Sequence, residues 1–168
     1  MKPLSLRSTL GASAAAVLLS LAPSAFAQKA IVVVRHAEKA DQSTDPVLSP
    51  EGTTRAVALA KALAAMDVEA VYVTQYQRTA LTAVPLMKAA SLKAIQIHSD
   101  ASAELVERMK KEHPTEVVLT VGHSNSVPRI LKLLGVTETI ELGDSDYDDL
   151  FVVVPAASGP PTLLRLKY

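Results

Sequence analysis

The chain has 168 residues, no cysteine, and 17 basic side chains against 17 acidic ones. This length is enough for one domain with a full hydrophobic core, and 49% hydrophobic and 20% charged residues exclude a disordered or fibrous chain. The absence of cysteine excludes a disulfide scaffold, a thiolate metal site and a cysteine nucleophile. The balanced charge gives no reason to expect nucleic acid or an anionic membrane surface as a partner.

The first 27 residues have the three-part pattern of a secretory signal peptide. A basic start is followed by a mainly apolar run over residues 10–21 and by a small-residue cleavage site at Ala25-Phe26-Ala27. The apolar run is shorter than the roughly 20 residues that a membrane span needs, so we expect no span. We therefore expect residues 1–27 to be removed on export to a bacterial periplasm, or else to the medium. The working domain would then be residues 28–168, with 15 basic and 17 acidic side chains.

This domain alternates between strand-like and helix-like stretches. The expected strands are residues 30–34, 70–74, 93–98, 116–121, 150–154 and 162–166, and the expected helices are residues 50–66, 78–90, 101–112 and 126–134. Ser49 and Pro50 favour a helix start, as N-cap and first helical residue. Pro85 is expected to shorten or kink its helix. The helix over residues 101–112 is rich in charge and is expected to be exposed.

The order of these elements predicts the fold class. Strands that alternate with helices indicate parallel βαβ units, and the last two strands, joined through Ser158-Gly159-Pro160-Pro161, predict a closing hairpin. We therefore expect one three-layer α/β domain with a mostly parallel sheet flanked by helices. Residues 138–149 carry six of the 17 acidic residues and are expected to be a solvated loop.

Two arginines and two histidines follow the ends of three expected strands. Arg35 and His36 end the first strand, Arg78 follows the second, and His123 follows the fourth. Ligands bind at the carboxyl ends of the strands in an open parallel sheet, so we expect these four side chains to line one site.

This combination suits the transfer of a phosphoryl group. Two guanidinium groups can hold phosphate oxygens through bidentate bonds, and they stay charged at any working pH. A neutral imidazole can attack phosphorus and form a covalent phosphohistidine. A second imidazole and the backbone N–H groups after Gly122 can bind the oxygens on which charge develops. Because cationic side chains fill that role, no metal or other cofactor is expected.

Four stretches resemble motifs of the histidine phosphatase superfamily, whose fold is phosphoglycerate-mutase-like. Arg35-His36-Ala37-Glu38 resembles its Arg-His-Gly-Glu signature, and Leu48-Ser49-Pro50-Glu51-Gly52 is similar to its Leu-Thr-x-x-Gly helix start. Residues 74–83 resemble its Ser-x-x-x-Arg-x-x-x-Thr-Ala stretch, and residues 121–124 resemble its second-histidine motif.

The resemblance implies that residues 28–168 are a histidine phosphatase domain. It implies that His36 is the phosphorylated nucleophile and that a phosphate pocket surrounds it. The phosphate-binding residues that it implies are Arg35, Arg78, His123 and Ser124. The insertions that complete a mutase substrate site are missing at this length, which favours hydrolysis of phosphate esters over mutase activity.

Two positions depart from the family pattern. Ala37 stands in place of Gly, which adds a methyl group next to the nucleophile, and Thr74 stands in place of Ser, which keeps the hydroxyl. The extended form Arg-His-Ala-Glu-Lys, together with residues 147–151, resembles a small exported bacterial branch of the family.

Several carboxylates compete for the role of the acid that protonates the leaving oxygen. Family members often place this group after the third strand, where Asp100 and Glu104 stand, and the spacing from Arg78 slightly favours Glu104. The plainer alternatives are that Asp100 caps the following helix and that Glu104 faces solvent. The remaining candidates are Glu38, Asp146 and Asp148.

Other side chains have simpler interpretations. The expected structural residues are His98, His113, Tyr72 and Tyr76, and the expected residues of the pocket mouth are Lys39 and Gln42. Residues 122–126 nearly match the Gly-x-Ser-x-Gly nucleophile elbow, but that arrangement needs a histidine later in the chain than its serine. No histidine follows His123, so esterase chemistry on Ser124 is not expected.

The sequence thus predicts a metal-independent phosphomonoesterase that acts on a small phosphorylated substrate through a phosphohistidine on His36. The alternatives are a phosphate-group binding protein without turnover and a protein phosphohistidine phosphatase. An exported location favours phosphosugars, lipopolysaccharide phosphates or scavenged phosphoesters over glycolytic intermediates. No particular oligomeric state is predicted.

Overall fold

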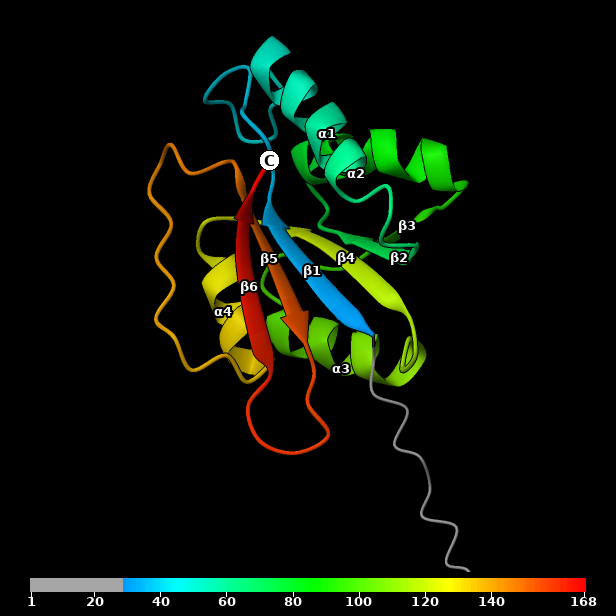
Figure 1. The fold of residues 1–168 in the computed structure, drawn as a ribbon. Helices are drawn as coiled ribbons and strands as arrows, with labels where there is room; N and C mark the ends of the chain where they lie inside the picture. The colour runs from blue at the N-terminus through cyan, green and yellow to red at the C-terminus, as the bar shows by residue number, and fades with distance from the viewer. Residues whose placement is uncertain (1–28) are drawn as a thin grey trace, which may run out of the picture.

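A sheet of six strands forms the centre of residues 29–168, the part of the chain that this computed structural model describes (Figure 1). The strands are β1 (Ala30–Arg35), β2 (Val68–Val73), β3 (Ala94–Gln96), β4 (Val117–Gly122), β5 (Asp149–Val154) and β6 (Thr162–Lys167), in the order β3-β2-β4-β1-β5-β6. The first four run parallel, whereas β5 is antiparallel to β1 and β6 is antiparallel to β5. The predicted mostly parallel sheet and the closing hairpin are confirmed. The predicted signal peptide lies outside the described residues.

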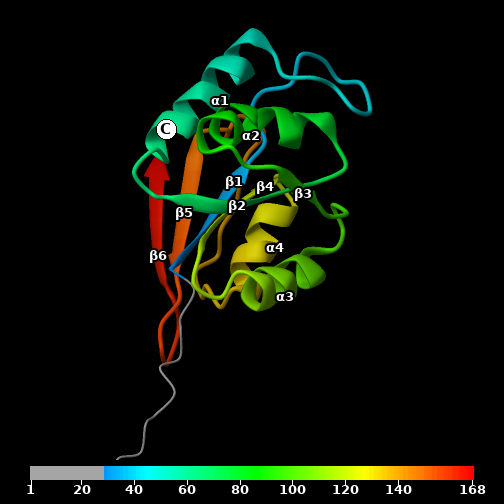
Figure 2. The ribbon, with the colours of Figure 1, turned by 90° about the vertical axis from the view of Figure 1, so that its right-hand side faces the viewer.

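Two helices cover each face of this sheet (Figures 1 and 2). On one face lie α1 (Pro50–Ala62) and α2 (Gln77–Ala90), which bury Leu59 and Leu86 in one core cluster. On the other face lie α3 (Ser102–Glu112) and α4 (Ser126–Leu133), which bury Met109 and Ile130 in a second cluster. The alternating side chains of the central strands supply both clusters, because successive residues of a strand point to opposite faces. The fold is therefore the predicted three-layer α/β architecture.

The two central strands bring the motif residues together. Every residue of β1 and of β4 is buried, and their parallel register pairs Arg35 with Gly122 at the carboxyl ends. The His36 N–H then donates to the Gly122 carbonyl oxygen at 2.9 Å, which extends the ladder by one step. The next residues of both strands, His36 and His123, are thus neighbours at one edge of the sheet.

Several local expectations differ from the structure. The first helix ends at Ala62 and does not reach residue 66. Pro85 does not shorten α2, which keeps its expected end at Ala90, because burial of the helix face around it offsets the loss of one backbone hydrogen bond. The third strand has only three residues, since it lies at the sheet edge and pairs with β2 alone. The charged helix α3 is not exposed all round, because Leu105 and Met109 lie in the core.

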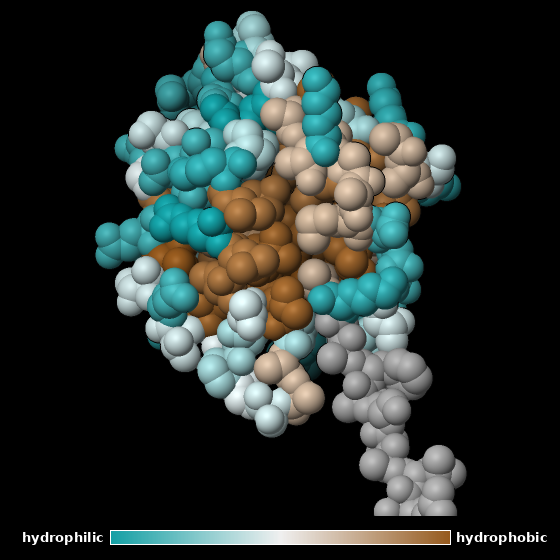
Figure 3. Space-filling view, viewed as in Figure 1, coloured by the Kyte–Doolittle hydropathy of each residue, from teal (hydrophilic) through white to brown (hydrophobic). Residues whose placement is uncertain are grey.

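Apolar side chains gather in the middle of the face that Figure 3 turns to the viewer, over β5 and β6. Val154, Leu164 and Leu166 of these strands are among the large apolar residues that remain exposed. This surface lies at the end of the sheet, because β6 is the outermost strand and pairs with β5 alone. Within residues 29–168, no helix has the length and apolar character needed to cross a membrane.

Candidate active site

An open pocket of about 560 Å³ lies at the carboxyl ends of β1, β2 and β4. It is lined by Arg35, His36, Lys39, Tyr76, Arg78, Ser99, Asp100, His123, Ser124, Asn125 and Asp144. The structure therefore brings together the four side chains that follow the strand ends, together with Ser124. Parallel strands produce this clustering, since their carboxyl ends share one edge of the sheet.

His36 is buried and is held in one tautomer. Its Nδ1 lies 2.8 Å from the Ala37 carbonyl oxygen, and a carbonyl can only accept, so Nδ1 carries the proton and donates it. The Nε2 atom is then left with its lone pair. Burial lowers the pKa of His36 from 6.5 to about 3, and the charges of Arg78 and Arg35 act in the same direction. At neutral pH this imidazole is neutral, as a nucleophile must be.

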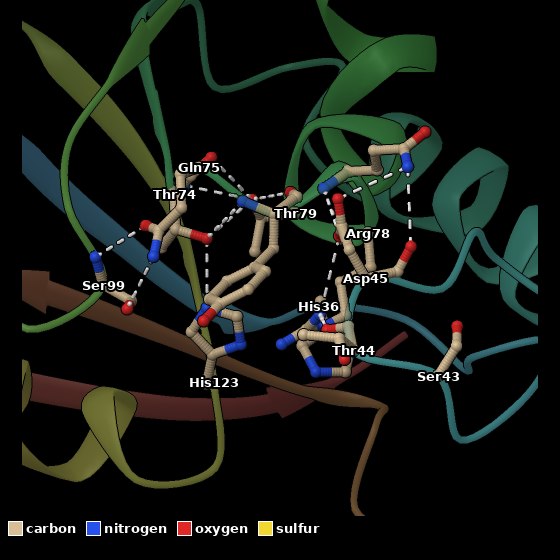
Figure 4. Close-up of polar contacts among 12 residues, drawn as sticks. His36, Ser43, Thr44, Asp45, Thr74, Gln75, Arg78, Thr79, Ser99 and His123 are labelled. Carbon is tan, nitrogen blue, oxygen red and sulfur yellow. Dashed lines mark hydrogen bonds and ion pairs between the residues drawn. The ribbon is translucent and has the colours of Figure 1, made fainter.

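His123 packs against His36, with ring centroids 5.3 Å apart and the rings at 63°. Its Nε2 shares a hydrogen bond of 3.0 Å with the Thr74 hydroxyl, which also contacts the Thr79 hydroxyl at 3.1 Å (Figure 4). Its backbone N–H donates to Ser126 Oγ at 2.9 Å and so is not available to an anion. Burial, reinforced by the two nearby arginines, lowers the pKa of His123 to about 4.

The backbone after His36 is tied to α2 through one threonine. The Ala37 N–H donates to Thr82 Oγ1 at 2.9 Å, and that hydroxyl donates to the Arg78 carbonyl oxygen at 2.8 Å. Thr82 belongs to the Thr-Ala end of the motif over residues 74–83, and it is fully buried. This short chain of bonds fixes the nucleophile's segment relative to the second arginine.

The two arginines have similar surroundings. Arg35 donates from Nη1 to the Gly143 carbonyl oxygen at 2.7 Å. Arg78 donates from Nη1 to the Thr44 carbonyl oxygen at 3.4 Å, and the same atom lies 3.7 Å from Asp45 Oδ1 (Figure 4). In both side chains Nε is buried and has no hydrogen-bond partner among residues 29–168. Buried polar groups are normally paired, so each guanidinium group keeps an unused donor beside the pocket.

The structure separates the two leading acid candidates. Asp100 lines the pocket, and its loop is held by Gln75, which accepts from the Ser99 N–H at 2.9 Å and donates to Ser99 Oγ at 3.1 Å (Figure 4). Glu104 lies on α3 with its side chain exposed, and it is not part of the pocket lining.

The other acid candidates are engaged elsewhere. Glu38 accepts two hydrogen bonds from Arg55 Nε, at 2.7 and 2.9 Å. Asp146 accepts the Gly143 N–H at 2.7 Å, and Asp148 pairs with Lys167 at 2.7 Å.

The acidic stretch before β5 is more than a solvated loop. Its residues 143–147 lie against Arg35, and Asp144 reaches the pocket. Sequence reasoning missed Asp144 and Tyr147. The signal that would have found them is the topology: β5 runs antiparallel beside β1, so the residues that precede β5 lie next to the carboxyl end of β1.

The remaining predicted residues divide between the pocket and the core. Tyr76 lines the pocket, whereas Tyr72 is fully buried as expected. Lys39 lines the pocket and donates to Gln42 at 2.9 Å, but Gln42 is not part of the lining. His98 and His113 are not part of the lining. His98 is largely exposed, and its Nδ1 lies 3.6 Å from Asp100 Oδ2. His113 Nδ1 lies 2.7 Å from Glu116 Oε2. Across residues 29–168, no group of three or more His, Cys, Asp and Glu is placed to hold a metal ion.

Comparison with known proteins gives a match to one family model and a set of structural neighbours. Residues 31–102 match the family model of the histidine phosphatase superfamily (branch 1). No curated protein sequence matches the chain. The protein histidine phosphatase SixA, solved with tungstate, is 18% identical, with a TM-score of 0.67 over 82% of this chain and 96% of that one.

Two further solved structures are similar in the same way. A phosphoserine phosphatase of Entamoeba histolytica, in complex with 3-phosphoglyceric acid, is 17% identical, with a TM-score of 0.64 over 84% of this chain and 98% of that one. A mycobacterial glucosyl-3-phosphoglycerate phosphatase is 16% identical, with a TM-score of 0.61 over 74% of this chain and 89% of that one. These neighbours share the phosphoglycerate-mutase-like fold. Residues 31–102 thus match the histidine phosphatase superfamily, and the described residues have the fold of these neighbours.

Proposed function

We propose that this protein is a metal-independent phosphomonoesterase that works through a phosphohistidine on His36. One observation carries the proposal: a neutral imidazole with Nε2 unprotonated lies in the same pocket as two guanidinium groups whose Nε donors are unpartnered. The nucleophile and the cationic groups that hold its target are therefore in one place, in the protonation states that phosphoryl transfer needs.

In the first half of the reaction, the Nε2 lone pair of His36 attacks phosphorus and the bond from phosphorus to the ester oxygen breaks. Arg35 and Arg78 hold the non-bridging oxygens through charge-assisted bonds, and His123 contacts the same oxygens from the end of the neighbouring strand β4. The leaving oxygen takes a proton as it departs. The product of this half-reaction is a phosphohistidine on His36 and a free alcohol.

In the second half, water attacks the phosphohistidine and the bond from phosphorus to Nε2 breaks. Inorganic phosphate leaves, and His36 returns to its neutral state with Nδ1 still bonded to Ala37. We assign the proton transfers of both halves to Asp100, because it lines the pocket and Glu104 does not. Ser124, two residues before α4, lies beside His123 and lines the pocket as a further contact to the phosphoryl group.

We further propose an exported location and a small phosphorylated substrate. The leader-like pattern over residues 1–27 supports export. An open pocket with polar walls supports a substrate whose leaving group is hydrophilic, and the phosphorylated sugars and acids in the names of the structural neighbours are of this kind.

The decisive test is hydrolysis of p-nitrophenyl phosphate in the presence of EDTA by the wild type and by His36→Ala. The wild type is expected to turn over and His36→Ala to lose nearly all activity, while His113→Gln, a histidine change outside the pocket, keeps it. Rapid quenching during turnover should trap acid-labile phosphate on the wild type alone. A wild type that binds inorganic phosphate but does not hydrolyse the ester would be a binding protein and would contradict the proposal.

A further inference from the structure

Each arginine of the pocket lies over the face of a tyrosine ring. The guanidinium carbon of Arg35 is 4.1 Å from the centroid of the Tyr147 ring, and that of Arg78 is 4.3 Å from the centroid of the Tyr76 ring. Both distances are well inside the roughly 6 Å limit for an attractive cation–π contact. The two tyrosines come from unrelated places, one from the segment before β5 and the other from the turn between β2 and α2.

Each of these tyrosines also packs against one of the pocket histidines. The Tyr147 ring is 6.0 Å from the His36 ring at an angle of 50°, and the Tyr76 ring is 5.4 Å from the His123 ring at 89°. One tyrosine therefore joins Arg35 to His36, and the other joins Arg78 to His123. The same three-part unit of arginine, tyrosine and histidine occurs twice around one pocket.

A ring face suits a phosphate-binding arginine better than a carboxylate does. A carboxylate accepts the N–H groups of the guanidinium and neutralises its charge, so it competes with the phosphoryl group. An aromatic face attracts the same cation through its π electrons and leaves the N–H donors in the guanidinium plane free. The Nε donors of Arg35 and Arg78 have no partner among the described residues. Arg78 also has a carboxylate near it, since its Nη1 lies 3.7 Å from Asp45 Oδ1, whereas Arg35 has none within ion-pair distance among the described residues.

We propose that Tyr147 and Tyr76 are positioning residues, which hold Arg35 and Arg78 flat against their rings so that the free edges of both guanidinium groups face the phosphoryl group. This inference rests on the proposed function. It adds a role for two residues that the sequence analysis did not place in the site. It also explains why residues 143–147 lie against the site: the Gly143 carbonyl and the Tyr147 ring hold Arg35 from two directions.

The test compares leucine and phenylalanine at both positions, with inorganic phosphate as the probe so that no leaving group takes part. Tyr147→Leu and Tyr76→Leu are each expected to weaken phosphate affinity by about 3- to 30-fold, the range of a partly desolvated cation–π contact. Tyr147→Phe and Tyr76→Phe keep the ring and should bind within about 2-fold of the wild type. Ser145→Ala, in the same segment as Tyr147, is the matched control and should bind as the wild type does.

A double-mutant cycle distinguishes positioning from a general loosening of the fold. In an Arg35→Gln background, which removes the cation, Tyr147→Leu should cause little further loss, whereas Tyr76→Leu should cause its full loss. In an Arg78→Gln background, Tyr76→Leu should cause little further loss and Tyr147→Leu its full loss. Equal losses in every background, or phosphate affinity unchanged in both leucine variants, would overturn the inference. Because the readout is phosphate binding, an inactive wild type would contradict the proposed function and leave this inference to be decided by the same cycle.

Discussion

His36 and His123 are buried as neutral rings, and this links the stability of the protein to pH. Burial holds their pKa values at about 3 and about 4, below the ordinary value of 6.5 that both recover on unfolding. Below pH 6.5 the unfolded chain therefore binds protons that the folded chain does not. Stability is complete above this pH and falls as the pH decreases towards the folded-state values.

We expect the free energy of unfolding to be lower at about pH 4.5 than at neutral pH. Protonation of each of these two histidines in the unfolded chain should account for a decrease on the order of 2 kcal/mol. Urea unfolding at both pH values measures this decrease. His36→Gln should remove the contribution of His36 to this decrease. The double variant His36→Gln with His123→Gln should remove the contributions of both residues. His98→Gln changes a largely exposed ring and should leave the dependence as it is. If the double variant kept the pH dependence of the wild type, the two rings would not be the source.

If Asp100 donates the proton, the effect of replacing it should depend on the leaving group of the substrate. An alkyl phosphate releases a basic alkoxide that needs a proton, whereas p-nitrophenolate leaves without one. Asp100→Asn should therefore lower kcat by about 10²- to 10⁴-fold on an alkyl phosphate and much less on p-nitrophenyl phosphate. Glu104→Gln, outside the pocket, should match the wild type on both substrates.

Asp144→Asn completes this comparison, because Asp144 is the other carboxylate in the pocket lining. If the loss on the alkyl phosphate appeared in Asp144→Asn and not in Asp100→Asn, the proton donor would be Asp144 and the assignment to Asp100 would be wrong.

The residues that the sequence identified and those that it missed differ in a physical way. Arg35, His36 and His123 were predictable because each ends or directly follows a buried strand, and parallel strands end at one edge. Tyr147 and Asp144 precede a strand, so their place depends on the direction in which that strand runs. A run of acidic residues does not reveal that direction.

At the scale of elements, the start of α1 is fitted to the motif that carries the nucleophile. The Ser49 N–H donates to the Glu38 carbonyl oxygen at 3.0 Å, and Ser49 Oγ accepts the Gly52 N–H as the N-cap. A Cβ on Gly52 would overlap that same Glu38 carbonyl oxygen. The Glu38 side chain in turn binds Arg55 one turn further along α1. The helix start and the strand end are therefore one packed unit.

Gly52→Ala should separate these two elements. Overpacking of this kind costs about 1–3 kcal/mol, and here the displaced group is the backbone two residues after His36. We expect a lower midpoint of thermal unfolding together with a lower kcat. Gly159→Ala is the control, since no atom lies within 4 Å of a Cβ there and the hairpin tip is far along the chain from the pocket motifs. It should affect stability alone. A fully active Gly52→Ala would show that α1 does not set the geometry of the site.

Two elements depart from what local sequence rules predict, and in both cases tertiary contacts are the reason. Pro85 removes one backbone bond from α2, but Ala83 and Leu86 are buried on either side of it and hold the helix in place. The third strand was expected to span residues 93–98, yet only Ala94–Gln96 pairs, because a strand at the edge has one neighbour. Local periodicity shows neither the packing around Pro85 nor the position of β3 at the edge.

At the scale of the whole molecule, the last hairpin connects the site to the far edge of the sheet. Asp149 begins β5 as a fully buried carboxylate, and Arg165 of β6 donates to it at 2.8 and 2.9 Å. These bonds favour the ionised carboxylate and lower the pKa of Asp149. Because Tyr147 lies two residues before Asp149, this pairing also fixes the point from which residues 143–147 reach Arg35.

The expected cleavage position before Gln28 lies at the end of the domain that is away from the pocket. Lys29 lies at the amino end of β1, and Arg35 and His36 lie at the other end of that strand, so the pocket is remote from the expected cleavage position. A chain that begins at Gln28 keeps all of β1 and every pocket residue, and it should equal the full chain in thermal midpoint and in kcat/KM. In a bacterial host, the exported protein should have the mass of residues 28–168. Retention of residues 1–27 on the exported protein would contradict the assignment of a cleaved leader, and a less active Gln28 chain would show that the domain extends into those residues.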